Sequence, residues 1–194
     1  YTVKLVVTSD YGYKDSATKV VDVFQIPVAD FQFVNACEGT AITFDDKSSL
    51  PTGTPTFEWD FGTNPKSTAT GASTSKLYSV PNSYNVTLKV TVNGCSSVAS
   101  KFVTQEPRTS PDFSFTTGQC DNKDVVFTNL TNQPPFGSAS YFWKYGDGVQ
   151  STEVSPKHTY NTFTTFNVTL ISSTNFGCTD SIQKTVTLNQ SPTA

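Results

Sequence analysis

The amino-acid sequence predicts an all-β protein built as tandem antiparallel β-sandwiches arranged end to end. Three observations predict this class: a strand-like composition, short runs of alternating apolar and polar residues, and a repeat of about 82 residues. Hydrophobic residues make up 36% of the chain and charged residues 15%, while β-branched and aromatic types that suit half-buried strands are abundant. No ten-residue segment shows an amphipathic helical period, so crossover helices and a parallel β/α fold are disfavoured.

Three sequence marks define the repeat. The first mark recurs at an offset of 83 (84 − 1) and again at an offset of 82 (166 − 84), and the other two recur at almost the same spacing. The marks are YTVKL at 1–5 with YNVTL at 84–88 and FNVTL at 166–170, ADFQF at 29–33 with PDFSF at 111–115, and FEWDFG at 57–62 with YFWKYG at 141–146.

This register divides the chain into repeats. We expect the C-terminal strands of a preceding repeat in residues 1–27, complete repeats in 28–106 and 107–190, and the start of a further repeat in 191–194. The parent protein is expected to continue at both ends. The junctions carry proline, which fixes φ and favours extended backbone, so neighbouring repeats should have limited freedom.

Each complete repeat should contain six or seven short strands. The clearest strand places apolar residues at every second position, which predicts one buried face and one solvated face. These residues are Tyr84, Val86, Leu88, Val90 and Val92. Gly, Pro, Asn and Ser clusters separate this strand from similar short runs.

The four cysteines have two equal spacings. The sequence separation of Cys37 and Cys95 equals that of Cys120 and Cys178 (95 − 37 = 178 − 120), so repeat symmetry predicts one disulfide inside each complete repeat. Closing such a loop should stabilise each domain by about 4 kcal/mol in the chain-entropy model. Tyr13 stands at the position of the later cysteine in the first repeat, which should therefore lack this bond.

The cysteines allow two other interpretations, a zinc site and buried free thiols. A zinc site is disfavoured because the sequence has no CxxC pair and a single histidine. Buried free thiols in a cytosolic protein are disfavoured because matched cysteines in turns are typical of oxidising compartments. We therefore expect an extracellular location.

An aromatic strand leading into a glycine turn is the next recurring feature. A tryptophan in a central strand suits the core of a sandwich, glycines allow positive φ in the turn, and an acidic side chain can accept from turn amides. Two tyrosines, each six residues before the next aromatic, should pack and bond at a strand corner. The residues concerned are Trp59 and Trp143, Gly146, Asp147 and Gly148, and Tyr78 and Tyr160.

The succession WKYGDG at 143–148, PKHTY at 156–160 and FNVTL at 166–170 resembles the PKD domain, an immunoglobulin-like β-sandwich of surface proteins. The second repeat departs from it, with Thr63 and Asn64 in place of Asp-Gly and Leu77 in place of His158. The early cysteine and the late Gly-Cys pair resemble repeats of large, type IX-secreted surface and gliding adhesins of Bacteroidota. That resemblance implies display on the cell surface, attached to the outer membrane through other parts of the parent.

No catalytic constellation is found in the sequence. His158 is the only histidine and is interpreted as a structural residue, so the protein is expected not to be an enzyme, and no cofactor is expected. Asp45, Asp46 or Asp147 could offer oxygen to calcium, but the spacing of a calcium loop is absent and no metal site is predicted. Ser16 and Ser181 follow aspartates in Asp-Ser-apolar triplets that resemble O-glycosylation acceptors of Bacteroidota.

The functional hypothesis is a structural stalk or spacer of a large secreted bacterial surface adhesin. The alternative is a carbohydrate-binding accessory module of a secreted hydrolase, in which exposed aromatics would contact sugar rings. Expected partners are neighbouring repeats of the same chain, secretion and anchoring machinery, and surface glycans. A net charge of −3 without a basic cluster disfavours nucleic acid, and no apolar run is long enough to span a membrane.

Overall fold

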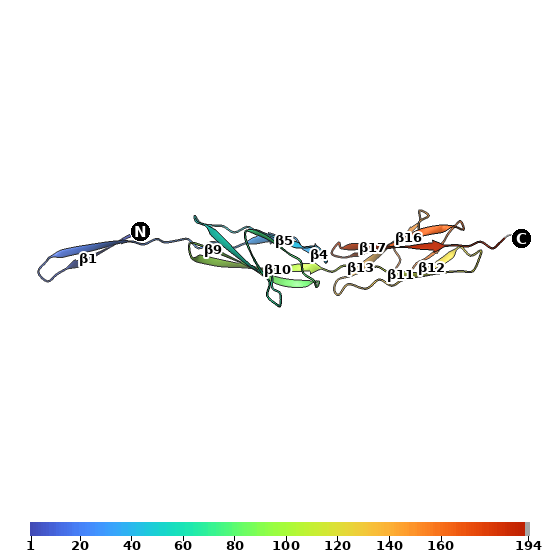
Figure 1. Cartoon of the computed structure of the whole chain (residues 1–194), viewed down its shortest axis with the longest axis horizontal. Coiled ribbons are helices and arrows are strands. Elements are labelled where there is room, and N and C mark those ends of the chain that lie inside the picture. The colour runs from blue at the N-terminus through green and yellow to red at the C-terminus, as the bar shows by residue number, and fades with distance from the viewer. Residues whose placement is uncertain (193–194) are drawn as a thin grey trace. The chain divides into compact units, whose positions relative to one another are not determined.

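The computed structural model describes residues 1–192, which form β-strands and loops without a helix (Figure 1). The predicted tandem β-sandwich fold is confirmed. The prediction that a further repeat begins at 191–194 lies partly outside the described residues. No helix of residues 1–192 has the length and apolar character needed to cross a membrane.

The chain divides into two compact units. The first unit comprises Tyr1–Val34, Thr43–Ser75 and Tyr84–Phe102. The second comprises Asn35–Ile42, Lys76–Ser83 and the chain from Val103 onward, so two short segments of the second repeat belong to the same unit as the third repeat.

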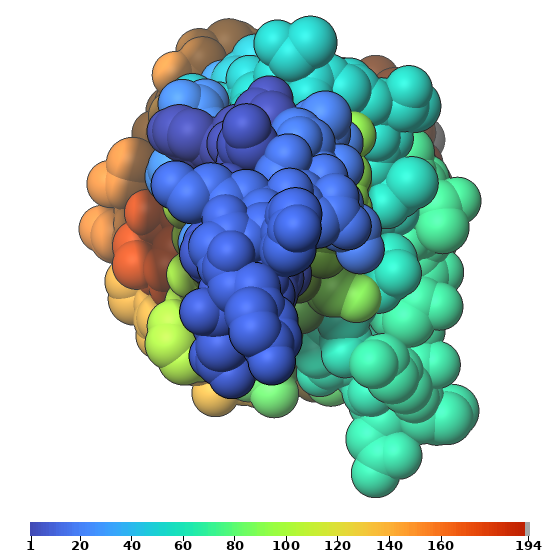
Figure 2. All heavy atoms as spheres, turned by 90° about the vertical axis from the view of Figure 1, so that its left-hand side faces the viewer, coloured from blue at the N-terminus to red at the C-terminus, as the bar shows by residue number. Residues whose placement is uncertain are grey.

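A two-stranded hairpin opens the first unit. β1 (Thr2–Thr8) pairs antiparallel with β2 (Lys14–Val20), and Leu5 lies opposite Ala17 in the register. Every side chain of both strands is exposed, and Leu5 is 64% exposed. The atoms of this hairpin are among the blue spheres of Figure 2. Two strands without a covered face are marginally stable in water, so this hairpin carries an unburied apolar side.

The second repeat contains two sheets. The smaller has the order β3-β5-β8 and the larger β4-β10-β9-β6-β7, in which β4 pairs parallel to the end of β10. The apolar positions of β9 from Val86 to Val92 are buried and the positions between them are not, which confirms the predicted period. The strands are β3 (Phe31–Phe33), β4 (Ala36–Cys37), β5 (Ile42–Asp46), β6 (Pro55–Asp60), β7 (Thr68–Thr70), β8 (Ser73–Lys76), β9 (Asn82–Val92) and β10 (Cys95–Glu106).

The third repeat repeats this plan in the second unit. Its sheets have the orders β11-β12-β15 and β14-β13-β16-β17, and their facing side chains form one buried apolar cluster around Trp143. The strands are β11 (Phe113–Thr117), β12 (Asp124–Asn129), β13 (Ala139–Lys144), β14 (Gln150–Ser151), β15 (Lys157–Thr159), β16 (Thr165–Thr174) and β17 (Thr179–Thr187).

Trp59 and Trp143 lie in the two cores. Each is almost fully buried, and each indole Nε1 donates to a backbone carbonyl, Trp59 to Gly71 at 2.8 Å and Trp143 to Glu153 at 3.0 Å. Phe113 packs edge-on against Trp143 at a centroid distance of 5.1 Å. Each tryptophan thus fills the core without leaving its N–H unpaired.

The glycine that follows this aromatic strand has a packing reason. Gly62 and Gly146 have φ of 67° and 87°, and a Cβ at either would lie 2.5 or 2.7 Å from the carbonyl oxygen of Asn85 or Asn167. Only glycine allows the backbone to approach the neighbouring strand this closely. The glycine of the recurring Trp-x-aromatic-Gly sequence is therefore explained by the close approach of the chain to the long strand that pairs with β6 or β13, which is β9 or β16.

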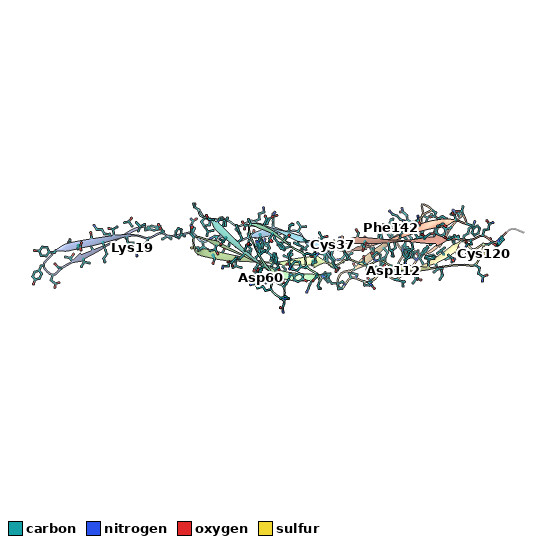
Figure 3. The ribbon with its side chains drawn as sticks, viewed as in Figure 1. Lys19, Cys37, Asp60, Asp112, Cys120 and Phe142 are labelled. Carbon is teal, nitrogen blue, oxygen red and sulfur yellow. A yellow bond between two sulfur atoms is a disulfide. The ribbon has the colours of Figure 1, made fainter. Side chains whose placement is uncertain are left out.

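The recurring Asp-Phe mark is explained by a lysine from the last strand. Lys101 Nζ lies 2.7 Å from Asp30 Oδ1, and Lys184 Nζ lies 2.7 Å from Asp112 Oδ1. Each lysine also donates to the carbonyl of the following phenylalanine. Lys19, labelled in Figure 3, stands at the equivalent position of the hairpin (101 − 82).

Candidate functional site

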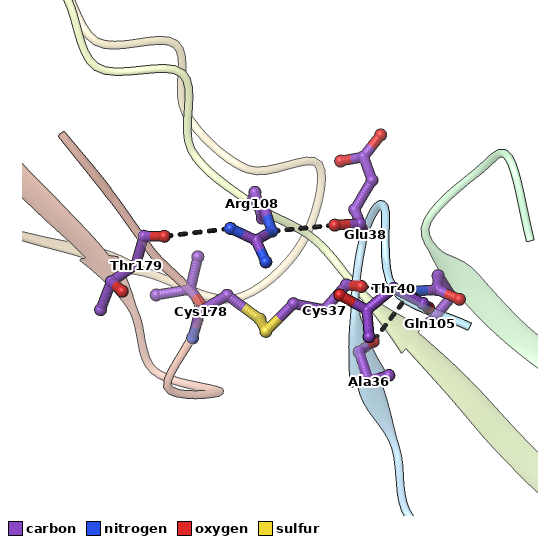
Figure 4. The surroundings of a disulfide bond; sticks show 9 residues. Ala36, Cys37, Glu38, Thr40, Gln105, Arg108, Cys178 and Thr179 are labelled. Carbon is purple, nitrogen blue, oxygen red and sulfur yellow. Dashed lines mark hydrogen bonds between the residues drawn. A yellow bond between two sulfur atoms is a disulfide. The ribbon is translucent and has the colours of Figure 1, made fainter. Parts of the chain in front are cut away.

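A disulfide joins consecutive repeats. Cys37, the last residue of β4, is bonded to Cys178, which directly precedes β17, and their Cα atoms are 5.7 Å apart (Figure 4). The two cysteines are separated by 141 residues in the sequence, and both belong to the second unit. The bond therefore ties the end of β4 in the second repeat to the last hairpin of the third.

This pairing corrects the disulfides predicted inside each repeat, Cys37 with Cys95 and Cys120 with Cys178. Cys37 pairs with Glu106 at the end of β10, whereas Cys95 is the first residue of that twelve-residue strand. An extended strand rises about 3.3 Å per residue, so Cys95 and the pairing partner of Cys37 lie at opposite ends of a strand roughly 36 Å long. A disulfide needs Cα atoms within about 7 Å.

The same geometry separates the other predicted pair. Asp121, next to Cys120, donates its N–H to the carbonyl of Asn189 beyond the end of β17, whereas Cys178 precedes the start of this strand. Cys95 and Cys120 are free thiols in the described structure, half-buried and exposed respectively. The equal spacing of the two predicted pairs reflects the repeat and does not identify bonding partners.

Gln105 shapes the loop that presents Cys37. Its side chain is fully buried, and its Nε2 donates to the carbonyls of Cys37 at 2.7 Å, Ala36 at 3.0 Å and Thr40 at 3.3 Å. Glu38 N–H donates to Glu106 O at 2.7 Å. A buried amide that satisfies several backbone carbonyls fixes the loop in one conformation.

Arg108 connects the two sides of the disulfide. Its Nε donates to the carbonyl of Glu38 at 2.8 Å and its Nη1 to the carbonyl of Thr179 at 3.2 Å, each residue directly following a bonded cysteine (Figure 4). The planar guanidinium has several donors in fixed directions, so one side chain can serve both carbonyls. The disulfide and Arg108 together form two parallel links, which we call the joint.

Buried hydroxyls lie beside the joint. Thr109 Oγ1 and Ser172 Oγ share a hydrogen bond, and both residues are buried. Thr174 Oγ1 accepts from the Cys178 N–H at 3.3 Å. These contacts hold the linker after β10 and the hairpin that carries Cys178.

Sequence reasoning missed Gln105 and Arg108. Gln105 reads as one more residue of an alternating strand, and its burial depends on the loop that folds over it. Arg108 did carry a signal, because it is the only arginine in the sequence and lies in a junction.

Three side chains at the joint lie close enough to share a metal ion. The ligand atoms of Cys37, Glu106 and Cys178 fall within 4.8 Å of one another. Both sulfurs are joined in the disulfide and so are not the thiolates that bind metals.

The two aspartates that the sequence offered as oxygen donors for calcium accept hydrogen bonds from serines. Asp45 Oδ1 accepts from Ser73 Oγ at 2.8 Å, and Asp46 Oδ1 accepts from Ser48.

His158 and Asp147 occupy the aromatic turn of the third repeat. Asp147 Oδ1 accepts from the Val149 N–H at 3.0 Å, and Gly146 and Gly148 on either side have positive φ. His158 stacks on Tyr145 with a centroid distance of 4.0 Å. The histidine is therefore enclosed by the turn, in keeping with a structural role.

The two corner tyrosines are buried. Tyr160 stacks on Phe166 at 4.0 Å and its hydroxyl donates to the Tyr145 carbonyl at 3.1 Å. Tyr78 is 3% exposed, with Lys76 Nζ 6.0 Å from its ring centroid. Because both tyrosines are buried, their rings are not available as surface aromatics.

Ser16 and Ser181 are exposed on β2 and β17. In each case the preceding aspartate, Asp15 or Asp180, accepts a hydrogen bond from the serine N–H at 2.7 Å. The two triplets thus share one local conformation and leave both hydroxyls on the surface.

A shallow groove crosses the larger sheet of the second repeat. Ion pairs line it, between Glu58 and Lys89 at 3.2 Å and between Asp60 and Lys66 at 3.0 Å. Trp59 also lines the groove but is 1% exposed, so its ring offers no stacking platform for a sugar.

These features define a tandem array of immunoglobulin-like β-sandwiches with a covalent link between consecutive repeats. The chain belongs to the PKD domain family, whose model matches residues 24–105 and 108–189. No curated protein sequence matches the chain.

Solved structures with similar folds include two single PKD domains. The PKD1 domain of Vibrio anguillarum Epp is 24% identical, covering 43% of this chain and 96% of that domain, with a TM-score of 0.39. The PKD1 domain of the Vibrio cholerae metalloprotease PrtV is 26% identical, covering 41% of this chain and 95% of that domain, with a TM-score of 0.38. A segment of a 1.5-MDa bacterial ice-binding adhesin is 14% identical, covering 98% of this chain and 74% of that segment, with a TM-score of 0.40.

Proposed function

We propose that this chain is a non-catalytic, load-bearing spacer of an extracellular protein, in which PKD repeats are linked into a covalently reinforced stalk. The disulfide between Cys37 and Cys178 is the observation that carries the proposal. This bond crosses from one repeat to the next, so it restrains the motion of one domain against the other. A spacer under tension benefits from such a restraint.

The compartment follows from the same bond. Structural disulfides persist in oxidising environments and are rare in the cytosol of most organisms. The PKD family assignment and the disulfide together support a secreted protein. Within this proposal, the parent is a large surface adhesin of the type IX-secreted, gliding-associated class, supported by the early cysteine and the late Gly-Cys pair of each complete repeat.

The joint also changes the path of tension. A force applied at the two ends of the chain reaches Cys37, crosses the disulfide and leaves at Cys178, so residues 38–177 are bypassed. Most core residues of both complete repeats lie inside this bypassed loop, Trp59 and Trp143 among them. The strands inside the loop are therefore protected from the load, which passes along β3, β4 and β17 instead.

Single-molecule pulling from the chain termini tests this role. Reduction should lengthen the fully extended chain by roughly 470–510 Å, because 141 residues at about 3.3–3.6 Å each become extensible. The Cys37→Ser variant should behave like the reduced chain, and the Cys95→Ser variant like the oxidised wild type. Equal extension before and after reduction would show that the joint carries no load.

The carbohydrate-binding alternative rests on exposed aromatics. Phe102 is 74% exposed on β10 and Tyr11 is 90% exposed in the hairpin turn. Co-sedimentation with insoluble polysaccharides separates the two functions, since a spacer is not retained. Retention of the wild type that is lost on Phe102→Ala or Tyr11→Ala would favour the alternative.

A further inference from the structure

The two free cysteines stand at the positions of the two bonded ones. Cys120 follows Cys37 at the same offset at which Cys178 follows Cys95 (120 − 37 = 178 − 95). Cys120 is thus the counterpart of one half of the existing disulfide, and Cys95 is the counterpart of the other half.

The backbone around Cys120 is already arranged like that around Cys37. Glu38 N–H donates to Glu106 O at 2.7 Å, and Asp121 N–H donates to Asn189 O at 3.2 Å. These pairs correspond under the same offset (121 − 38 and 189 − 106). Figure 3 shows Cys120 at the opposite end of the second unit from Cys37, and Cys120 is exposed.

A hydrogen bond from a later residue holds the loop at Cys120, at the position where Arg108 holds the loop at Cys37. The position at this offset after Arg108 is Ser191 (191 − 108), whose N–H donates to Asp121 Oδ1 at 3.0 Å. The chain leaving the third repeat is therefore held against the loop that presents Cys120, as the chain leaving the second repeat is held at Glu38 through Arg108.

Cys95 occupies the same hairpin position as Cys178. Each directly follows a glycine of positive φ, Gly94 at 81° or Gly177 at 85°, and each opens the last strand of its repeat or directly precedes it.

The segment that leads into each repeat is also built in the same way. Val28 bridges Ser49 in the second repeat, and Ser110 bridges Asn132 in the third. The side of the second repeat that carries Cys95 thus has the features of the side of the third repeat that carries Cys178.

We propose that Cys120 and Cys95 are two open halves of the same inter-repeat cross-link. Cys120 bonds the cysteine at the Cys178 position of another repeat of this kind, and Cys95 bonds the cysteine at the Cys37 position of another. The repeats then form a disulfide ladder in which the early cysteine of each repeat is joined to the late cysteine of the next.

The reaction is thiol–disulfide exchange with a small disulfide donor. Two cysteine thiols and one donor disulfide give one inter-repeat disulfide and two donor thiols, and the two cysteine protons pass to the departing donor thiolates. Tyr13 has no thiol at the late position, so the first repeat cannot receive this cross-link there.

The test uses the full chain with its Cys37–Cys178 bond intact. The chain is incubated in a mixture of oxidised and reduced glutathione, and the disulfides are mapped by mass spectrometry of unreduced peptides. The ladder geometry predicts that intermolecular Cys95–Cys120 bonds exceed Cys95–Cys95 and Cys120–Cys120 bonds by about tenfold, equivalent to a docking preference of ~1.4 kcal/mol. Proportions set by random coupling, or glutathione adducts alone, would overturn the proposal.

Two single variants provide the matched control. The Cys95→Ser variant keeps Cys120 as its one free thiol, and the Cys120→Ser variant keeps Cys95. Each variant alone should remain monomeric, while an equal mixture of the two should form a mixed dimer. Homodimers forming from either variant as fast as the mixed dimer would contradict the proposal. The Gln119→Cys change in the Cys120→Ser background moves the thiol by one residue and should abolish the excess of mixed bonds over like-with-like bonds. An unchanged excess would also contradict the proposal.

Discussion

His158 Nε2 lies 2.7 Å from Asp147 Oδ2, and the imidazole ring is enclosed between Tyr145 and Tyr160. Burial alone raises the pKa of Asp147, but the hydrogen bonds from His158 and from the Val149 N–H outweigh it and hold this pKa below its ordinary value. The ionised carboxylate therefore stabilises the folded third repeat.

This pair predicts an acid-dependent loss of stability. Because the folded-state pKa of Asp147 is depressed, its contribution is complete above the ordinary aspartate pKa of about 4 and is lost as the pH falls through the folded value. Asp147→Asn should flatten the acid limb of a plot of unfolding free energy against pH. The effect should shrink in a His158→Gln background, and an equal effect in both backgrounds would show that the two residues are not coupled.

The hydroxyl of Tyr160 should contribute more to the unfolding free energy than a surface hydroxyl does. It donates to the Tyr145 carbonyl in the core, and burial raises the pKa of Tyr160. Tyr160→Phe should lower the unfolding free energy by about 1–3 kcal/mol, because a buried acceptor loses its donor. Tyr141→Phe, which removes the exposed hydrogen bond that the Tyr141 hydroxyl accepts from Gln133 Nε2, is the matched control and should leave the denaturant midpoint nearly unchanged.

Gly146 and Gly148 should respond differently to alanine. Both have positive φ, so alanine at Gly148 should cost about 1–2 kcal/mol from backbone conformation alone. Alanine at Gly146 should cost more, because its Cβ would lie 2.7 Å from the Asn167 carbonyl oxygen, whereas no atom lies within 4 Å at Gly148. Urea unfolding of both variants measures the difference, and equal losses would show that close approach to β16 is unimportant.

Lys184 should control the ionisation of Asp112. The hydrogen bond from the Lys184 side chain, followed by that from the Phe113 N–H, holds the pKa of Asp112 below its ordinary value. Lys184→Met should raise the pKa of this carboxyl, which carbon NMR of labelled aspartate can follow against pH. Lys19→Met in the hairpin is the control and should leave the Asp112 resonance unchanged.

The joint should contribute strongly to thermodynamic stability. Closing a loop of 141 residues stabilises the folded state by about 5 kcal/mol in the chain-entropy model. Cys37→Ser and Cys178→Ser should each lower the unfolding free energy by up to that amount under oxidising conditions. Cys95→Ser should have little effect in the monomer, and a loss as large as that of Cys37→Ser would contradict the pairing.

Much of the fold could be predicted from the sequence because its physical causes are local. The period-two pattern from Val86 to Val92 fixes which face of β9 is buried, since successive side chains of a strand point to opposite faces. The tryptophans and the glycine turn also predicted a sandwich core, because their signals lie within short stretches of sequence. The burial of Gln105 could not be predicted from the sequence, because it depends on a loop that is distant in the sequence.

The repeat period, the strand alternation and the equivalence of the cysteines were determined by the sequence alone. Which cysteines bond was decided only by the tertiary structure. The two cysteines of each repeat lie at opposite ends of a long strand, so their equal separation along the chain becomes a distance that no disulfide spans. Folding instead brings together Cys37 and Cys178, which are 141 residues apart, because the end of one repeat meets the last hairpin of the next within a single compact unit.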